Sequence, residues 1–165
     1  MSDTLALPQH FTASAFVLRP DRRVLLLHHR KLGVWLYPGG HVEERETPDA
    51  AAVREVLEES GRRVRILGGR DHALDEPASG VSALHTPYRV LCELIQDPKG
   101  PHYHIDLIYL CEPVSDADGE DFDSDQIGFF ACEQTASMKL FPNFRRMLAQ
   151  VYRDDSLWPA AELVR

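Results

Sequence analysis

The chain has 165 residues, of which 44 % are hydrophobic and 27 % are charged. These values are typical of one soluble globular domain, which we expect to span 1–165 with an N-terminal segment (1–10) and a C-terminal tail (156–165). The formal net charge of −8 argues against broad attraction to nucleic acid, which depends on a basic surface. A small phosphorylated ligand is compatible with this charge, because a metal ion can neutralise phosphates locally.

The chain carries no signal for a membrane or for secretion. No run of about 18 apolar residues occurs, so no membrane span is expected. The N-terminus, Met1 to Thr4, lacks the basic stretch and the apolar core of a secretory signal. The cysteines (Cys92, Cys111 and Cys132) are odd in number and widely spaced, which favours reduced core thiols in a cytoplasmic protein.

Short apolar runs predict the secondary structure in chain order. Strands are expected at 12–18, 24–28, 63–68, 88–94, 105–111 and 127–131, which are rich in aliphatic and aromatic residues. One helix is expected from 48 to 60. A second is expected from about 142 to 152, where apolar residues repeat at helical spacing (Phe144, Met147, Leu148 and Val151). Strands that alternate with two helices predict an α/β fold with a mixed sheet between helices.

The first helix has recognisable start and stop signals. Thr47 can accept a hydrogen bond from a free N–H of the first turn, and Pro48 suits the first helical position. Asp49 adds a negative charge that the helix dipole favours. Gly61 is the natural residue to end the helix in a left-handed turn.

The acidic side of this helix is the most informative feature of the chain. At about 100° per residue, Glu55, Glu58 and Glu59 fall within an arc of about 100°. Ala51 lies among these carboxylates, where a small side chain would leave room for a ligand. The opposite side is expected to pack against the sheet through Ala50, Val53, Val56 and Leu57.

Three carboxylates at these spacings repel one another, and a divalent cation would turn this repulsion into a binding site. An isolated E-x-x-E-E pattern is more often a solvated acidic face. Here Gly39 and Gly40 precede the helix, and paired glycines let backbone groups approach a metal or phosphate closely. Glu46 and Arg54 are spaced to bridge this loop and the helix. The flanking residues therefore favour a metal site.

The spacing over 40–62 resembles the signature of the Nudix hydrolases, G-x5-E-x7-R-E-U-x-E-E-x-G-U, with U aliphatic. The matching residues are Gly40, Glu46, Arg54, Glu55, Val56, Glu58, Glu59 and Gly61. Arg62 departs from the final aliphatic position, where we expect a mild packing change covered by Val64. The resemblance covers this box and the order of elements, and it implies a three-layer α/β/α Nudix fold.

The resemblance also implies roles for individual residues and Mg²⁺ or Mn²⁺ as the cofactor. Glu58 and Glu59 match the main metal ligands, and Glu55 matches a carboxylate that serves as ligand, general base or both. The backbone carbonyl of Gly39 matches a ligand seen in some members, and Arg54 matches the residue that orients the glutamates. Three further residues match structural positions of the box: Gly40, Glu46 and Gly61.

Outside the box, His102, His104 and Asp106 alternate where the chain enters the strand predicted at 105–111, and on a strand all three would face one way. They are candidates for a phosphate site, a second metal site or a catalytic base, with His104 the first choice. An exposed polar face is the alternative. Tyr37, beside the two glycines, is the candidate for stacking on a base. Three other aromatic residues, for which burial in the core is the simpler explanation, are Tyr88, Phe129 and Phe130.

The acidic run at 116–125 resembles a calcium loop only in composition. If Gly119 took the sixth position of such a loop, Val114 would occupy the first, where a carboxylate is needed. We therefore expect a solvated loop. Nudix enzymes often place an additional glutamate near the metals, and the sequence does not distinguish between the candidates Glu112, Glu120 and Glu133.

These residues predict a Nudix pyrophosphatase, a hydrolase of acid anhydride bonds that acts on a nucleoside diphosphate linked to another moiety. Water made more acidic by the cation would attack phosphorus, and Glu55 or a carboxylate outside the box would take its proton. ADP-ribose, nucleotide sugars, dinucleoside polyphosphates, nucleoside triphosphates and capped RNA ends fit the box equally well. Homodimers are common in the family.

Two alternatives belong to other functional classes. The first is a non-catalytic Nudix-fold module that binds a nucleotide or a protein, although such modules usually lose box glutamates that are complete here. The second is an enzyme similar to isopentenyl-diphosphate isomerase. That family has a degenerate box, and its catalytic cysteine has no obvious match in this chain.

Overall fold

The computed structural model describes residues 7–114 and 126–160, which form a mixed sheet of eight strands with helices around it. The strands are β1 (Gln9–Arg19), β2 (Arg23–His29), β3 (Val34–Leu36), β4 (Gly39–His41), β5 (Val64–Ile66), β6 (Arg89–Asp97), β7 (Gly100–Pro113) and β8 (Ile127–Phe130). The sheet runs in the order β3-β2-β1-β7-β5, with β4 paired to β1, β6 to β7 and β8 to β2. The pair β1–β7 is parallel and the other pairs are antiparallel.

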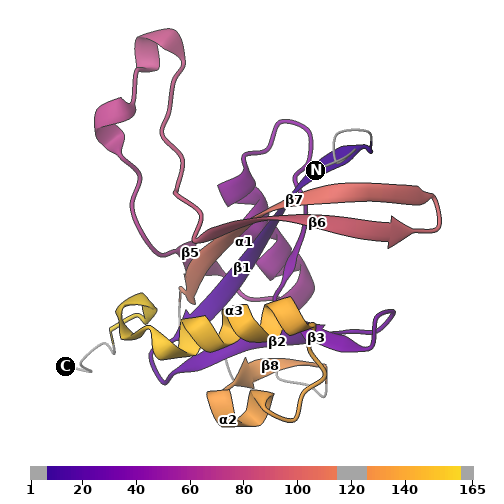
Figure 1. The fold of residues 1–165 in the computed structure, drawn as a ribbon. Coiled ribbons are helices and arrows are strands. Elements are labelled where there is room, and N and C mark those ends of the chain that lie inside the picture. The colour runs from indigo at the N-terminus through magenta and orange to yellow at the C-terminus, as the bar shows by residue number, and fades with distance from the viewer. Residues whose placement is uncertain (1–6, 115–125, 161–165) are drawn as a thin grey trace.

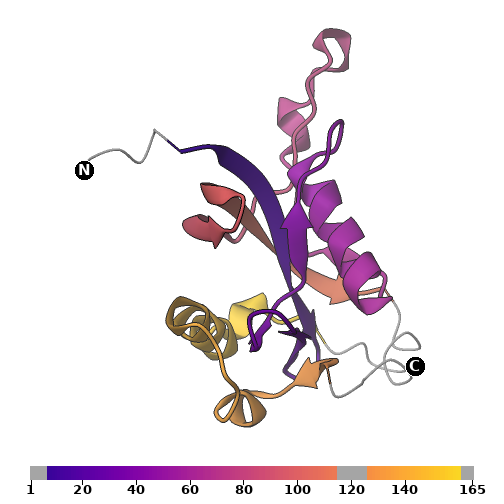
Figure 2. The ribbon, with the colours of Figure 1, turned by 90° about the vertical axis from the view of Figure 1, so that its right-hand side faces the viewer.

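Helices cover both faces of the sheet. Helix α1 (Pro48–Ser60) lies on one face and α3 (Pro142–Arg153) on the other, while the short α2 (Cys132–Thr135) follows β8 (Figures 1 and 2). The central strand β1 is buried on both sides, with Ala13 and Ala15 in the core under α1 and with Phe16 and Leu18 in the core under α3. The predicted three-layer α/β/α fold with a mixed sheet is confirmed.

The predicted strands and helices are present with ends shifted by a few residues, but β3 and β4 were not predicted. Each has three residues, and the glycines of β4 have little intrinsic preference for a strand. Strand β4 forms because its backbone pairs with β1, where Gly39 lies opposite Ser14. A Cβ at Gly39 would lie 2.2 Å from Ser14 Oγ, so this close pairing requires glycine.

The ends of α1 agree with the sequence in most respects. Gly61 ends the helix with a φ of 71°, and its N–H donates to the Leu57 carbonyl at 2.8 Å. The prediction for Thr47 was wrong, because its side chain does not cap a backbone N–H. Its hydroxyl instead donates to the Asp49 carboxylate, which also accepts from the Ala50 N–H.

The buried face of α1 differs from the prediction. Ala51 is fully buried in the core rather than beside a ligand space, whereas Ala50 is exposed and Leu57 is 44 % exposed. Val56 is buried as expected. The helix is thus rotated so that small residues and part of the acidic side face the sheet. Strand β4 permits this rotation because Gly40 has no side chain, and a Cβ there would lie 2.4 Å from Glu55 Oε1.

Two further expectations are corrected by burial. Of the three cysteines, Cys111 is a core thiol, whose pKa burial raises to about 12, while Cys92 and Cys132 are exposed. Arg62 is only 1 % exposed, and its guanidinium lies over the Phe129 ring at 5.0 Å from the centroid. The departure from the signature therefore places a cation–π contact in the core, a larger change than the mild repacking expected.

The connection from β5 to β6 projects away from the sheet and carries two short 3-10 turns (Figure 1). Its base is attached to α1, because the His85 ring lies 2.8 Å from the buried Asp49 carboxylate. Within residues 7–114 and 126–160, none of the helices has the length and apolar character needed to cross a bilayer.

One side-chain hydrogen bond between α3 and the sheet can be tested by substitution. The Tyr152 hydroxyl donates to the Phe130 carbonyl at 2.6 Å. Replacing Tyr152 with Phe removes this bond, and we expect the free energy of unfolding to fall by about 1 kcal/mol. Urea unfolding followed by circular dichroism measures the change. An unchanged midpoint would show that water replaces the bond without cost.

Candidate active site

Arg54 is the centre of an ion-pair network that joins α1 to the segment before it. Its Nε and Nη2 atoms donate to the two oxygens of Glu46 at 2.8 and 2.9 Å. Its Nη1 atom donates to Glu55 at 2.7 Å and to Glu58 at 3.1 Å, and Nη2 also donates to the His41 carbonyl. The hydrogen bond with Glu46 is the main cause that raises the pKa of Arg54. The predicted bridge between Glu46 and Arg54 is present.

Glu59 reaches from α1 to β4, where its carboxylate accepts a hydrogen bond from the Gly39 N–H at 2.9 Å. Burial raises the pKa of Glu59, and the negative charges of Glu55 and Glu58 raise it further. A Cβ at Gly40 would lie 2.4 Å from Glu55 Oε1, so the absence of a side chain there makes space for this carboxylate. Glu59 and Glu55 therefore lie against the two glycines, and Glu58, which accepts from Arg54, completes the acidic cluster.

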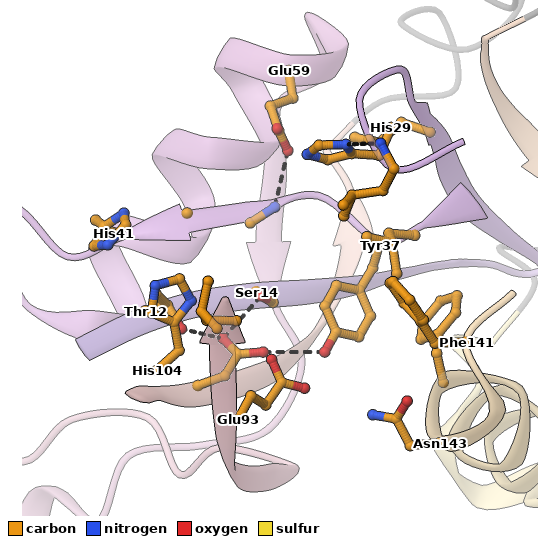
Figure 3. Close-up of a pocket in the computed structure, with 18 residues that line it drawn as sticks. Thr12, Ser14, His29, Tyr37, His41, Glu59, Glu93, His104, Phe141 and Asn143 are labelled. Atoms are coloured by element: carbon orange, nitrogen blue, oxygen red, sulfur yellow. Dashed lines mark hydrogen bonds between the residues drawn. The ribbon is translucent and has the colours of Figure 1, made fainter. Parts of the chain in front are cut away.

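A cavity of about 240 Å³ opens beside this cluster (Figure 3). Glu59 and the two glycines form one wall, and Tyr37 and Glu93 form others. The rim near the start of α3 carries Phe141, which is 40 % exposed, and Asn143. The cavity thus combines an acidic cluster, an exposed aromatic ring and amide and carboxylate groups.

Asp106 lies at the inner wall of this cavity, with 3 % exposure. Its carboxylate accepts from the hydroxyls of Thr12, Ser14 and Tyr37 at 3.0, 2.9 and 3.1 Å. Burial raises the pKa of Asp106, and these three hydrogen bonds oppose the shift. Burial also raises the pKa of Glu93, and the charge of Asp106 adds to the effect. Two carboxylates with raised pKa values therefore face the same cavity.

The predicted alternation on β7 is present. His102, His104 and Asp106 lie on one face of the strand, and His104 and Asp106 line the cavity. The Nε2 atoms of His102 and His104 are 3.1 Å apart. Burial lowers the pKa of His104 to about 4, and His41, His102 and His10 lower it further.

Tyr37 lines the cavity, but its ring is fixed edge-on against Phe16 and Phe144 and its hydroxyl is bonded to Asp106. It is therefore a rigid wall of the cavity, and the exposed Phe141 is better placed to stack on a flat ring. The other aromatic candidates pack in or against the two hydrophobic cores: Tyr88, Phe129 and Phe130.

The candidate glutamates outside the box do not line this cavity where the structure describes them. Glu112 forms an ion pair with Arg65 at 2.7 Å, and Glu133 is exposed on α2. Glu120, together with the rest of the acidic run at 116–125, lies outside the described residues. The glutamate outside the box that does line the cavity is Glu93.

Sequence reasoning did not select Glu93, Phe141 or Asn143. Glu93 had a usable signal, since it is the single charged residue at an inward position between Leu91 and Ile95 of an apolar strand. Phe141 and Asn143 flank the predicted helix start at Pro142 and gave no comparable signal.

The acidic cluster fits a divalent cation by the chemistry of its donors. Carboxylate oxygens and a backbone carbonyl are hard ligands of the kind that Mg²⁺ and Mn²⁺ prefer. Arg54 contacts one oxygen each of Glu55 and Glu58, so the second oxygen of each can take part in binding. The absence of a side chain at Gly40 lets the Glu55 carboxylate lie close to β4.

Comparison with known proteins agrees with this geometry. The family profile described as NUDIX domain matches residues 8–151. A Nudix-family hydrolase from Clostridium perfringens superposes with a TM-score of 0.71 and 27 % identity, covering 89 % of this chain and 98 % of that one. The Ap4A hydrolase of C. elegans shares the fold, with a TM-score of 0.58 and 16 % identity over 87 % of this chain and 96 % of that one.

Curated relatives match over a shorter stretch. A MutT-like protein from Streptomyces ambofaciens is 42 % identical over 60 residues, which are 36 % of this chain and 39 % of that protein. Diphosphoinositol polyphosphate phosphohydrolase 3-alpha from Mus musculus is 49 % identical over 53 residues, 30 % of this chain and 32 % of that protein. The matches span under two fifths of the length of these relatives. Because the family profile covers most of the chain, and the box and the fold agree with it, the chain belongs to the Nudix family.

Proposed function

We propose that the chain is a divalent-cation-dependent hydrolase of the pyrophosphate bond in a nucleoside diphosphate linked to another moiety. The observation that carries this proposal is the acidic cluster at the edge of a cavity of about 240 Å³. Arg54 holds Glu55 and Glu58, and Glu59 accepts a hydrogen bond from the Gly39 N–H beside the cavity. The match to the Nudix-family hydrolase from Clostridium perfringens supports a hydrolytic activity, because it covers 89 % of this chain and 98 % of that one.

A second cavity supports a substrate that has one moiety on each side of the diphosphate. It has a volume of about 550 Å³, and its lining includes Glu59 together with Arg30 and Lys31. Glu59 therefore lies between this basic cavity and the first one. We assign the phosphorylated leaving group to the basic side, because Arg and Lys offset phosphate charge.

The nucleoside moiety is assigned to the first cavity. Phe141 presents an exposed ring for stacking, and Asn143 presents an amide donor and acceptor beside it. Glu93 and Asp106 add carboxyl groups that can bind the polar edge of a base. The recognition would resemble the aromatic stacking and edge hydrogen bonding by which proteins bind unstacked bases.

Within this proposal, the cation bound by Glu58, Glu59 and the Gly39 carbonyl would neutralise the diphosphate and make water more acidic. Arg54 holds Glu55 and Glu58 in place through its N–H donors. The water oxygen forms a bond to phosphorus as the bridging P–O bond breaks, and the water proton passes to a carboxylate. Glu55 in the cluster and Glu93 in the cavity are the two candidates, and the pH profiles of Glu55→Gln and Glu93→Gln would distinguish them.

The experiment that tests the proposal is a substrate panel with Mg²⁺ or Mn²⁺ in ¹⁸O-labelled water. The panel contains a nucleoside triphosphate, a dinucleoside polyphosphate, a nucleotide sugar, ADP-ribose and a diphosphoinositol polyphosphate. We expect a nucleoside monophosphate among the products, and mass spectrometry of the products identifies the phosphorus that receives the label.

Each alternative outcome has a defined meaning. Tight nucleotide binding without hydrolysis of any compound would favour a non-catalytic module. Hydrolysis of the diphosphoinositol compound alone would retain the pyrophosphatase activity but contradict the nucleoside assignment. Interconversion of isoprenyl diphosphates without phosphate release would instead favour an isomerase.

Replacing Arg54 with Lys tests whether the arginine positions the glutamates. Lysine retains the charge but cannot contact both oxygens of Glu46 while reaching Glu55. We expect kcat to fall by about 10–30-fold and the free energy of unfolding to fall by about 1–2 kcal/mol. Steady-state kinetics and urea unfolding measure the two effects. Unchanged kcat in the variant would remove the positioning role.

A further inference from the structure

Four histidines from three strands meet at the edge of the cavity. They are His10 on β1, His41 on β4, and His102 and His104 on β7, and one ligand nitrogen from each lies within 4.8 Å of the others. His41 and His104 are seen on the same side of the cavity in Figure 3. Among the described residues, these four histidines are the group of three or more His, Cys, Asp or Glu side chains whose ligand atoms lie close enough together to hold a metal ion.

The register of the sheet places these side chains together. His10 is the partner of His104 across the parallel pair β1–β7, and His102 lies two residues earlier on the same face of β7. His41 is the partner of Thr12 across the antiparallel pair β1–β4. Thr12 lies two residues after His10 on β1. Residues two apart on a strand share a face, so all four side chains project to the same side of the sheet.

We propose that His10, His41, His102 and His104 bind a late first-row transition-metal ion of the Zn²⁺ type, at a site separate from the glutamate cluster. Imidazole nitrogen suits zinc, whereas Mg²⁺ prefers oxygen ligands. The donor atoms therefore separate the two sites, with four nitrogens in one and carboxylate oxygens in the other.

The geometry of two of the ligands is already close to that of a zinc site. Tetrahedral zinc with Zn–N bonds of about 2.0–2.1 Å has nitrogens about 3.3 Å apart, and the Nε2 atoms of His102 and His104 are 3.1 Å apart. The Nδ1 atom of His102 lies 3.3 Å from the Gly100 carbonyl. Because a carbonyl only accepts, Nδ1 must carry the hydrogen, which leaves the Nε2 lone pair for a metal.

The remaining two ligands require only a small adjustment. The ligand nitrogens of the four histidines lie at most 4.8 Å from one another. Because His10 and His41 are exposed, their rings can rotate toward the other two without disturbing the core. A bound ion would tie the start of β1 to β4, one residue from Gly40. It would also place positive charge on a cavity lined by Glu59, Glu93 and Asp106, which favours an anionic ligand there.

The test is zinc binding by the full chain without an affinity tag, in excess Mg²⁺ so that the oxygen site is saturated. Competition with a chromophoric chelator measures affinity and stoichiometry, and the visible absorption of Co²⁺ reports the ligand geometry. We expect one Zn²⁺ per chain and tetrahedral Co²⁺ bands. The double variant His102→Ala/His104→Ala should weaken Zn²⁺ binding by at least about 100-fold.

Two matched controls locate the ion. His72→Ala removes a histidine that is 73 % exposed on a distant turn, and Glu58→Gln removes a box carboxylate. Both should retain zinc affinity within about twofold. If the double variant does not fold, as judged by circular dichroism, then His10→Ala at an exposed position should still weaken binding about tenfold.

The proposal is overturned if the wild-type chain binds no zinc in excess Mg²⁺, or if these histidine variants bind it as well as the wild type does. Loss of zinc in Glu58→Gln alone would also overturn it, because the ion would then occupy the glutamate cluster. None of these readouts depends on the proposed hydrolysis.

Discussion

Replacing Glu58 with Gln is expected to lower kcat by about 10²–10⁴-fold and to weaken activation by Mg²⁺. Glutamine has almost the same shape but lacks the negative charge that a cation requires. The Glu58 side chain is 58 % exposed, and its ion pair with Arg54 lies at the surface, so the free energy of unfolding should change by at most about 1 kcal/mol. Steady-state kinetics over a Mg²⁺ titration, together with urea unfolding, separates the two effects.

The matched control is Glu76→Gln, which makes the same chemical change at an exposed position beside the distant turn Pro77–Ser79. Its kcat and Mg²⁺ dependence should equal those of the wild type. Full metal-dependent turnover in Glu58→Gln would contradict the proposed role of the box. A comparable loss in Glu76→Gln would show that the effect is not specific to the cluster.

Replacing Gly40 with Ala is expected to lower kcat by about 10²-fold through the position of Glu55. The added Cβ would lie 2.4 Å from Glu55 Oε1 and 2.5 Å from Glu55 Cδ, so the carboxylate must move by about 1 Å. Arg54 holds the same carboxylate at 2.7 Å, and a shift of Glu55 would therefore disturb the whole network. Kinetics at saturating Mg²⁺ measure the effect.

Gly69→Ala is the corresponding control, because a Cβ there meets no atom within 4 Å and the backbone φ is not in the left-handed region. It should leave both activity and stability unchanged. Wild-type kcat in Gly40→Ala would mean that Glu55 can move without loss of function. That result would remove Glu55 from the list of candidate bases and leave Glu93.

The local part of the site was predictable because its geometry follows from the helix. Glu55, Glu58 and Glu59 share one side at any rotation of α1, and Arg54 reaches Glu46 across a short loop. The direction in which this side points was not predictable. Ala51 and Leu57 were assigned to the wrong environments because a periodic pattern defines a helix face only relative to its neighbours, and here β4 with its two glycines is that neighbour.

Most of the cavity outside the box could not be predicted from the sequence. The alternation of His102, His104 and Asp106 was readable, since a strand requires it. Glu93, Phe141 and Asn143 come from β6 and the start of α3, and they meet the acidic cluster only through the packing of those elements. His10 and His41 lie beside His104 only because of two strand registers, that of β1 with β7 and that of β1 with β4.

The sequence by itself determined the family, the α/β class and the acidic cluster, because each is encoded in residues that are close along the chain. The tertiary structure alone decided which side of α1 is buried, which carboxylate outside the box faces the cavity, and which histidines meet. The physical reason is that strand pairing brings distant residues together, and a shift of one residue in register would turn every side chain of a strand to the opposite face.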